Sequence, residues 1–314
     1  MSYIYLLAIS LLTGLAVPST TPQFLLMKST RSPEVNTQDV LFRNTINVMK
    51  LQEVLQVSPP EFSQSRLSQA TDLLTSPEVV ASRKVCSGPK MYYQTLAALS
   101  AGQIYTRLKT NYWYPAANSR RQYSKLTYTD WKTLLAMEAK AIAEGQGKNR
   151  LSILIGDSLS MWFPKEKLPD GQLWLNQGIS GDTSTGVLKR LSIFSVTKPQ
   201  AIYIMAGIND LRRVIKAPTI INNHRLIIRR LRKTHPQTEI IIQSILPTRR
   251  ADLPNNYIRY INKQLAIASK QEGAKFVKIY NWFTDFQENL RPELTTDGLH
   301  LSQEGYDVWR SALK

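Results

Sequence analysis

Four short polar motifs, each close behind an apolar stretch, contain the residue types that acyl transfer requires. They are residues 156–158 (GDS), residues 176–182 (NQGISGD), residues 206–210 (AGIND) and a later segment, TTDGLH, that contains Asp297 and His300. A serine hydroxyl is a weak nucleophile until a base takes its proton, and an imidazole suits that task at neutral pH. Ser158 is therefore a candidate nucleophile, and His300 is its candidate base.

Neighbouring residues could complete such a site. A carboxylate must hold the imidazole in the correct tautomer and stabilise the imidazolium that forms, and Asp297 lies three residues before His300. The tetrahedral intermediate needs donors directed at its oxygen, which the backbone N–H groups of Ser158 and Gly178 and the side-chain amide of Asn209 could supply. The lack of a side chain at Gly178 would also let the backbone come close to a bound substrate.

Each motif taken alone also has a structural explanation. Gly-Asp-Ser is a favourable turn, and Asp157 or Ser158 could cap a short helix that follows. Asp182 is a natural cap for a helix beginning at Thr183, and Asp210 could pair with one of the arginines that follow it. The ordered occurrence of all four motifs, rather than any one of them, is what indicates catalysis.

The apolar stretches themselves predict a parallel sheet. They occur in LSILIG, LWLNQG, AIYIMAG, EIIIQSIL and KFVKIYNWF, and helical patterns accompany them in TSTGVLKRLSIF, TIINNHRLIIRRLRK, NNYIRYINKQLAIASKQ and SQEGYDVWRSAL. Strands that lack alternating polarity and are separated by helices are typical of a parallel sheet covered on both faces. Residues 148–314 are thus predicted to form one doubly wound α/β domain of about five strands. All four motifs would then meet at the sheet edge where ligands bind in such folds.

In this order and spacing, the motifs resemble the four blocks of the SGNH hydrolases, also called the GDSL esterase/lipase family. The matching segments are GDSLS with Ser158, NQGISGDT with Gly178, GIND with Asn209, and DGLH with Asp297 and His300. The resemblance covers about half of the chain and implies a flavodoxin-like three-layer α/β/α sandwich that hydrolyses carboxylic esters without a metal. It also implies that Ser158 is the nucleophile, His300 the base and Asp297 the orienting acid, with Ser158, Gly178 and Asn209 as the oxyanion hole.

Other catalytic classes are disfavoured. The GxSxG motif of the α/β-hydrolases is not matched, since Ser160 stands where its second glycine would be. No GxGxxG motif follows a strand, and no P-loop is present. One cysteine, Cys86, and three histidines without an HExxH motif make a metal cluster improbable. We therefore expect no cofactor and no metal, and an acyl ester as the substrate.

The formal net charge of +17 is compatible with an anionic partner. Arg225, Arg229 and Arg232 recur at helical spacing, so one helix face could dock on an anionic membrane or could simply be solvated. His224 on the same segment is expected at the surface. Nucleic acid is not expected as a partner, because only charge would favour it and no reader motif is present.

The N-terminal half is less informative. Residues 1–17 form an apolar segment like an export signal or short anchor, although no Lys or Arg precedes it and a membrane span needs about 20 residues. This segment predicts an exported, periplasmic or membrane-associated protein. Residues 18–147 are predicted to comprise a linker and a mostly helical region rich in tyrosine and tryptophan. Its rings would pack against the next domain or contact a sugar polymer.

Three functions remain open from the sequence. The first is a serine esterase or lipase acting on a lipid or small acyl ester, for which Met161, Trp162 and Phe163 could form an apolar rim or simply pack under the first helix. The second is an acetyl esterase or acyltransferase acting on an envelope polysaccharide. The third is a catalytically silent binding module with a basic surface, against which the complete set of five site residues argues.

Overall fold

The computed structural model describes residues 87–107 and 126–313. The predicted export or anchor segment, residues 18–86 of the N-terminal region and Cys86 lie outside the described residues. Within the two described ranges, no helix has both the length and the apolar character needed to cross a membrane.

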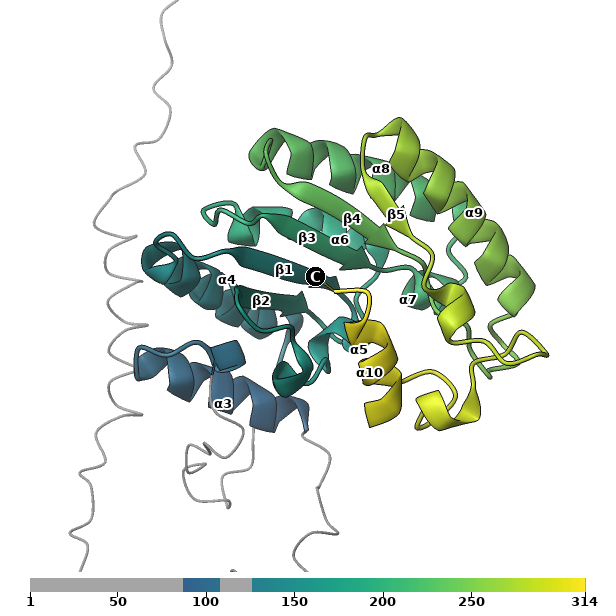
Figure 1. Ribbon diagram of the computed structural model, residues 1–314, viewed down its shortest axis with the longest axis horizontal. Coiled ribbons are helices and arrows are strands. Elements are labelled where there is room, and N and C mark those ends of the chain that lie inside the picture. Colours follow the sequence, from purple (N-terminus) through teal and green to yellow (C-terminus); the bar gives the residue numbers. More distant parts are fainter. Residues whose placement is uncertain (1–86, 108–125, 314) are drawn as a thin grey trace, which may run out of the picture. The chain divides into compact units, whose positions relative to one another are not determined.

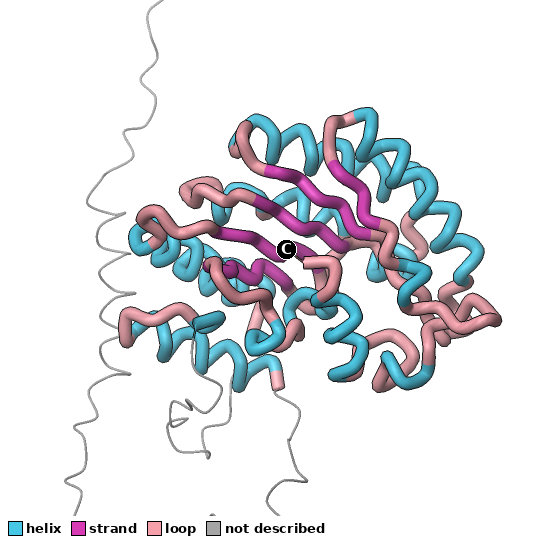
Figure 2. The backbone as a smooth tube through the Cα atoms, viewed as in Figure 1, coloured by secondary structure: helices cyan, strands magenta, loops and turns pink. Residues whose placement is uncertain are grey.

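Within the described residues, five parallel strands form one sheet in the order β2-β1-β3-β4-β5 (Figures 1 and 2). The strands are β1 (Leu151–Gly156), β2 (Leu173–Gly178), β3 (Ala201–Met205), β4 (Glu239–Gln243) and β5 (Lys275–Val277). In register, the last residue of β1, Gly156, lies beside Gly178 on one side and Met205 on the other. The winding reverses next to β1, so the loops after β1, β2 and β3 open at one edge. The predicted flavodoxin-like α/β sandwich of about five parallel strands is confirmed.

Helices cover both faces of the sheet. The α-helices are α3 (Gly88–Ser100), α4 (Tyr128–Gly145), α5 (Ser158–Met161), α6 (Ser184–Lys189), α7 (Ile208–Arg212), α8 (Ala217–Thr234), α9 (Asn255–Gln271) and α10 (Gln303–Arg310). The 3₁₀ turns are η4 (Tyr105–Arg107), η5 (Lys165–Lys167), η6 (Leu191–Phe194), η7 (Tyr280–Trp282) and η8 (Pro292–Leu294). On one face Ile153 and Ile155 of β1 pack with α4, α6 and α8, and on the other Leu154 packs with α5 and α10. Burial on both faces explains why the strands lack polar alternation.

Helix α4 belongs to the same core as the sheet. It begins with a capping box in which the Thr127 hydroxyl accepts from the backbone N–H of Asp130 and the Asp130 carboxylate accepts from Thr127. Ala139 and Ile142 of α4 are fully buried against residues of β1 and β2. Helix α4 therefore packs with the sheet although it precedes residue 147, and the predicted division into domains stays a prediction.

Two local expectations were wrong. The helix predicted over residues 183–194 is interrupted at Arg190, whose φ of −115° ends α6 before η6 begins. His224, expected at the surface, is 1% exposed. Its Nδ1 contacts the carbonyl oxygen of Ile220 at 2.9 Å, and burial lowers its pKa.

Candidate active site

Ser158 lies at the first position of α5, directly beyond the end of β1. Asp157 ends the strand conformation, and its carboxylate accepts a hydrogen bond from the backbone N–H of Leu159 at 3.0 Å. The cap predicted at Asp157 is therefore present. The short helix is also held from outside, because the Tyr306 hydroxyl donates to the carbonyl oxygen of Leu159 at 3.1 Å. These contacts fix the Ser158 backbone at the carboxyl edge of the sheet.

The structure brings Ser158, His300 and Asp297 together in a continuous chain of contacts. Ser158 Oγ lies 3.2 Å from His300 Nε2, and His300 Nδ1 lies 2.7 Å from Asp297 Oδ2. The second carboxylate oxygen of Asp297 accepts from the backbone N–H groups of Leu299 (3.0 Å) and His300 (2.7 Å). A neutral imidazole with its proton on Nδ1 satisfies both ring contacts and leaves Nε2 free to accept the serine proton.

The environment of Asp297 favours its ionised form. Burial raises the pKa of Asp297, but hydrogen bonds from the His300 ring and from the backbone N–H groups of His300 and Leu299 outweigh burial and hold that pKa below its ordinary value. The carboxylate is thus charged at neutral pH and can stabilise an imidazolium on His300.

The loop that carries the acid and the base folds back on itself. An isolated antiparallel bridge joins Thr295 to Leu301, and the Thr295 hydroxyl donates to the carbonyl oxygen of His300 at 2.7 Å. The backbone N–H of Arg249, in the segment after β4, donates to the carbonyl oxygen of Gly298 at 2.8 Å. The loop is therefore held by its own turn and by the segment that follows a neighbouring strand.

Asn209 offers one free amide hydrogen. It lies in α7, after β3, and its Nδ2 donates to the carbonyl oxygen of Asp182 at 3.0 Å, while its Oδ1 accepts from Arg212 at 3.3 Å. An amide nitrogen carries two hydrogens, so one remains for a ligand. The sequence suggested that Asp210 pairs with an arginine, but it has no arginine partner among the described residues. Its carboxylate accepts from the backbone N–H and hydroxyl of Ser184 at 2.8 and 2.5 Å, which ties α7 to α6.

The two glycines of the second motif have different environments. The backbone N–H of Gly178 donates to Asn176 Oδ1 at 2.9 Å, and a Cβ on Gly178 would lie 2.2 Å from the backbone of α5. Gly178 thus permits close packing of β2 against α5. Gly181 has φ +77°, and its backbone N–H has no hydrogen-bond partner among the described residues. It adjoins Asp182, whose carbonyl oxygen accepts the Asn209 amide.

Asp182 is not the helix cap that the sequence suggested. The cap of α6 is Thr183, whose hydroxyl accepts from the backbone N–H of Gly186 at 3.2 Å. Asp182 instead forms a buried ion pair with Arg190 at 2.7 Å, and Arg190 Nη2 donates to the carbonyl oxygen of Gly156 at 2.9 Å. Arg190 was missed as a site residue, because the residues it contacts lie on other elements.

The carboxyl group of Asp157 is buried directly beside the nucleophile. Burial raises its pKa to about 7, the hydrogen bond from Leu159 opposes that shift, and the negative charge of Asp182 adds to it. A substantial fraction of Asp157 is therefore protonated at neutral pH. No group of three or more His, Cys, Asp and Glu residues that could hold a metal ion occurs in the described ranges.

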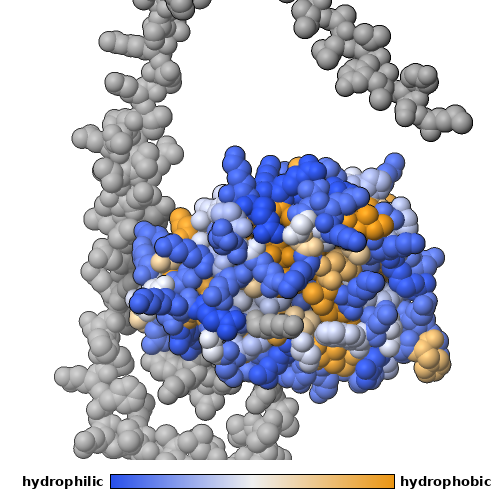
Figure 3. Space-filling view, turned by 45° about the horizontal axis from the view of Figure 1, so that its top comes forward, coloured by the Kyte–Doolittle hydropathy of each residue, from blue (hydrophilic) through white to orange (hydrophobic). Residues whose placement is uncertain are grey.

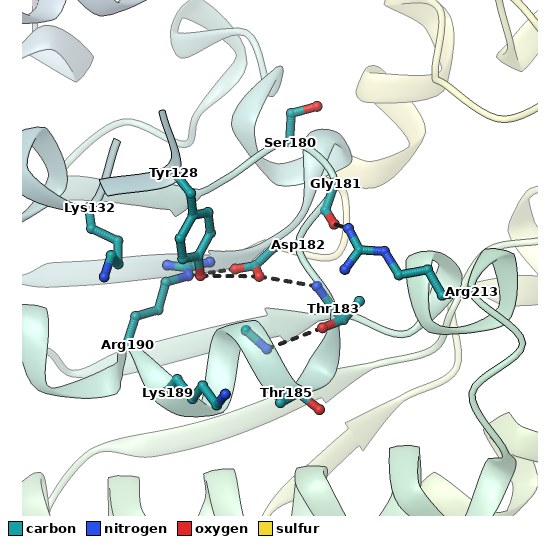
Figure 4. Close-up of a pocket in the computed structure, with 11 residues that line it drawn as sticks. Tyr128, Lys132, Ser180, Gly181, Asp182, Thr183, Thr185, Lys189, Arg190 and Arg213 are labelled. Atoms are coloured by element: carbon teal, nitrogen blue, oxygen red, sulfur yellow. Dashed lines mark hydrogen bonds and ion pairs between the residues drawn. The ribbon is translucent and has the colours of Figure 1, made fainter. Parts of the chain in front are cut away.

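A cavity of about 520 Å³ opens beside the second motif (Figure 4). Its lining residues come from α4, from residues 180–190 and from the segment after α7: Tyr128, Lys132, Ser180, Gly181, Asp182, Thr183, Thr185, Gly186, Lys189, Arg190 and Arg213. Four of the lining residues are basic, namely Lys132, Lys189, Arg190 and Arg213, and Arg190 is paired with Asp182.

The arginines predicted to face an anionic membrane make contacts within the chain. Arg225 and Arg229 pair with Glu272 at 3.0 and 2.7 Å, and Arg232 donates to the carbonyl oxygen of Gly273 at 2.7 Å. The face of the α/β domain seen in Figure 3 is largely hydrophilic, with hydrophobic residues gathered in patches between the polar ones. Membrane docking stays a prediction.

The chain is similar to known hydrolases. A family model described as the GDSL-like lipase/acylhydrolase family matches residues 142–308. A solved structure from Streptococcus pneumonia, provisionally described as a platelet activating factor, is 24% identical, with a TM-score of 0.54 over 59% of this chain and 91% of that chain.

Two further solved structures are similar at lower scores. A GDSL-like lipase from Bacteroides thetaiotaomicron is 22% identical, with a TM-score of 0.45 over 56% of this chain and 95% of that chain. An acetylxylan esterase from Geobacillus stearothermophilus is 17% identical, with a TM-score of 0.44 over 52% and 91%. No curated protein matches the chain.

Proposed function

Since the chain belongs to the GDSL-like lipase/acylhydrolase family, we propose that it is a serine esterase in which Ser158, His300 and Asp297 act as the catalytic triad. The observation that carries the proposal is the contact chain from Ser158 Oγ through both nitrogens of His300 to Asp297, at 3.2 and 2.7 Å. An acid, a base and a hydroxyl in this arrangement meet the requirements for nucleophilic acyl transfer.

The contacts support a two-step reaction. Ser158 Oγ attacks the ester carbonyl carbon while His300 Nε2 takes the serine proton, and Asp297 stabilises the imidazolium. The tetrahedral intermediate then expels the alcohol, to which His300 returns the proton, and an acyl-serine remains. Water, deprotonated by His300, attacks this acyl-serine, and the carboxylic acid leaves with regeneration of Ser158.

The oxyanion needs donors that the protein does not use elsewhere. Among the described residues, the backbone N–H of Ser158 and the second amide hydrogen of Asn209 have no partner and meet this condition. Gly178, the third donor that the family resemblance implies, would have to release Asn176 first. We favour Gly181 as the third donor, because its N–H is without a partner among the described residues and the next residue, Asp182, accepts the Asn209 amide with its carbonyl oxygen.

A short acyl group suits this site better than a long chain. Of the three residues that could have formed an apolar rim, Met161 and Phe163 are 5% and 4% exposed and pack in the core, and Trp162 is partly buried. The Phe163 ring contacts Tyr306 and Trp309 at centroid distances of 5.3 and 5.2 Å. These side chains are therefore not free to receive an acyl chain, and we expect acetyl and other short esters as substrates.

The test combines labelling with turnover. The purified full chain is treated with a serine-directed fluorophosphonate, the labelled peptide is identified by mass spectrometry, and hydrolysis of p-nitrophenyl esters of increasing chain length is measured. We expect the label on Ser158 and the highest kcat/KM for acetate. Ser158→Ala should lose both label and turnover.

Ser160→Ala is the matched control, because Ser160 Oγ is a buried hydroxyl on the same helix that has no hydrogen-bond partner in the described structure. It should keep the label. A label on a serine other than Ser158, or undiminished turnover in Ser158→Ala, would rule out the proposed mechanism.

A further inference from the structure

The cavity beside the second motif has the size of a small organic ligand rather than of a single ion. Its volume of about 520 Å³ lies within the range of roughly 300–1,000 Å³ found for ligand pockets. Figure 4 shows Lys132 and Tyr128 on one side of the Asp182 region and Arg213 on the other, with Lys189 projecting from α6. The lining thus surrounds the space with basic side chains from three separate elements.

The positive charge of this lining is not neutralised by the described part of the chain. Lys132, Lys189 and Arg213 form no ion pair with any described residue; Lys132 lies over the ring of Tyr128, 5.5 Å from its centroid. The acidic residue of the lining, Asp182, is occupied by Arg190 in the buried pair. A concave surface with uncompensated charge of one sign attracts a ligand of the opposite sign.

The remaining polar groups of the lining are suited to phosphate. Arginine offers a fork of N–H donors and lysine a point charge, both of which bind phosphate oxygens. Thr185 Oγ1 accepts from Asn223 at 2.9 Å, which leaves its hydroxyl hydrogen to donate, and Ser180 adds an exposed hydroxyl. The lining therefore contains two hydroxyl groups in addition to the three cations that form no ion pair among the described residues.

The cavity adjoins the proposed oxyanion donors. Arg213 Nη2 donates to the carbonyl oxygen of Gly181 at 2.9 Å, and the adjacent Asp182 carbonyl oxygen accepts the Asn209 amide. Val214, which follows Arg213, has φ 57°. This left-handed residue turns the chain after α7. A group bound in the cavity would therefore lie next to an ester whose carbonyl oxygen contacts Asn209.

We propose that this cavity binds a phosphate group on the alcohol part of the ester, so that the preferred substrates are short acyl esters of phosphorylated alcohols. The phosphate is assigned to the alcohol because phosphoric acid forms esters with hydroxyl groups, which polyols supply and acyl chains generally lack. The assignment of the ligand as part of the substrate rests on the proposed esterase function. Such a phosphate belongs either to a soluble polyol phosphate or to a lipid headgroup.

The binding test does not depend on catalysis. Glycerol 3-phosphate is titrated by calorimetry into the full chain and into Ser158→Ala, Lys189→Gln and Arg213→Gln variants. We expect Ser158→Ala to bind as the unaltered chain does. Each of the other two should bind about tenfold more weakly, since each loses a charge-assisted hydrogen bond to the phosphate.

Lys263→Gln is the matched control, because Lys263 is exposed on α9, away from the cavity lining, and forms no ion pair among the described residues. It should bind glycerol 3-phosphate within twofold of the unaltered chain. If Lys263→Gln and Lys189→Gln weakened the binding of glycerol 3-phosphate equally, the effect would come from net charge alone, and the proposed site would be overturned.

The kinetic test compares 1-acetylglycerol 3-phosphate with 1-acetylglycerol. We expect kcat/KM to favour the phosphate ester, and the ratio of the two values to fall about tenfold in Lys189→Gln and in Arg213→Gln. A third substrate, 1-palmitoyl-2-acetylglycerol 3-phosphate in micelles, carries the phosphate on a lipid. A higher kcat/KM for this ester than for 1-acetylglycerol 3-phosphate would indicate a lipid headgroup as the source of the phosphate, and a lower kcat/KM would indicate a soluble polyol phosphate. Thermal unfolding of each variant verifies that it is folded.

The possible failures are distinguishable. Equal kcat/KM for the phosphorylated and neutral esters, together with no binding of glycerol 3-phosphate, would overturn the phosphate site while leaving Ser158 as the nucleophile. Binding that depends on Lys189 and Arg213 without turnover of any ester would support the phosphate site and contradict the esterase.

Discussion

The guanidinium of Arg190 and the carboxylate of Asp182 form an ion pair at 2.7 Å, with side chains that are 1% and 3% exposed. The same guanidinium donates from Nη2 to the carbonyl oxygen of Gly156 at 2.9 Å, two residues before Ser158. The backbone carbonyl of Asp182 accepts the amide of Asn209. The pair thus joins the first three motifs and holds the proposed nucleophile and an oxyanion donor in a fixed relation.

Removal of Arg190 alone should therefore destabilise the fold strongly. Arg190→Met leaves Asp182 as a buried, uncompensated charge, and we expect a loss of about 3–5 kcal/mol in the free energy of unfolding. Urea unfolding measures the loss. Asp182→Asn combined with Arg190→Met removes both charges and should recover part of it.

Arg230→Met is the matched control, because Arg230 is exposed and, within the described part of the chain, its side chain donates only to the carbonyl oxygen of Leu188 at 3.2 Å. We expect a change within about 0.5 kcal/mol. Similar losses in Arg190→Met and Arg230→Met would show that the buried pair has no special role.

The sheet, and the edge at which the polar motifs gather, were predictable from the sequence for a physical reason. Strands buried on both faces must be apolar throughout, so LSILIG and AIYIMAG are recognisable as strands without knowledge of their partners. In a parallel sheet the carboxyl ends of the strands meet at one edge, so polar residues after separate strands are brought together. The rule brings the segments after β1, β2 and β3 to one edge, whereas the family resemblance was needed to pair Ser158 with His300, 142 positions away.

The polar contacts behind the site were not predictable, because their partners are distant in sequence. A local pattern suggested a helix cap at Asp182. In the structure, the guanidinium of Arg190 binds both the Asp182 carboxylate and the carbonyl oxygen of Gly156, which lies 34 positions before Arg190. The same limit applies to the two glycines of the second motif. Only the structure shows that the Gly178 N–H is bonded to Asn176 and that the Gly181 N–H is free of any described partner.

The amide of Asn209 should matter for the transition state and little for ground-state binding. Asn209→Ala removes one oxyanion donor, so we expect kcat to fall by about 10²–10³ with a small change in KM. Steady-state kinetics with p-nitrophenyl acetate measure both constants. Asn222→Ala, at an exposed position of α8, is the control and should retain kcat. A negligible effect of Asn209→Ala on kcat would remove this residue from the oxyanion hole.

Val214 should be a site where glycine stabilises the protein. It is 88% exposed and has φ 57°, a left-handed conformation that disfavours a β-branched residue by about 1–2 kcal/mol. Glycine adopts this conformation without strain, but its greater entropy in the unfolded chain offsets part of the gain. We therefore expect Val214→Gly to increase the free energy of unfolding by at most about 1 kcal/mol. Val196→Gly is the control, since Val196 is also exposed but does not have a positive φ, and it should lose stability. Loss of stability in Val214→Gly would contradict the strain at this turn.

Glu138 should make the stability of the protein depend on pH. This carboxyl group is buried on α4, and burial raises its pKa to about 8, although a hydrogen bond from the backbone of Tyr105 opposes the shift. Between its unfolded value, near 4.5, and about 8, the folded chain keeps a proton that the unfolded chain releases. The unfolded state therefore binds fewer protons, and stability falls as the pH rises through this window.

Glu138→Gln removes this proton and should therefore remove its share of the pH dependence. We expect the free energy of unfolding of Glu138→Gln, relative to the unaltered chain, to rise by up to about 1.4 kcal/mol per pH unit across the window and to level off above it. Urea unfolding from pH 5 to pH 9 measures the difference, from which the contribution of Asp157 cancels because both proteins contain it. Glu144→Gln, exposed on the same helix, should show no such slope. A difference that does not vary with pH would mean that Glu138 is ionised in the folded protein.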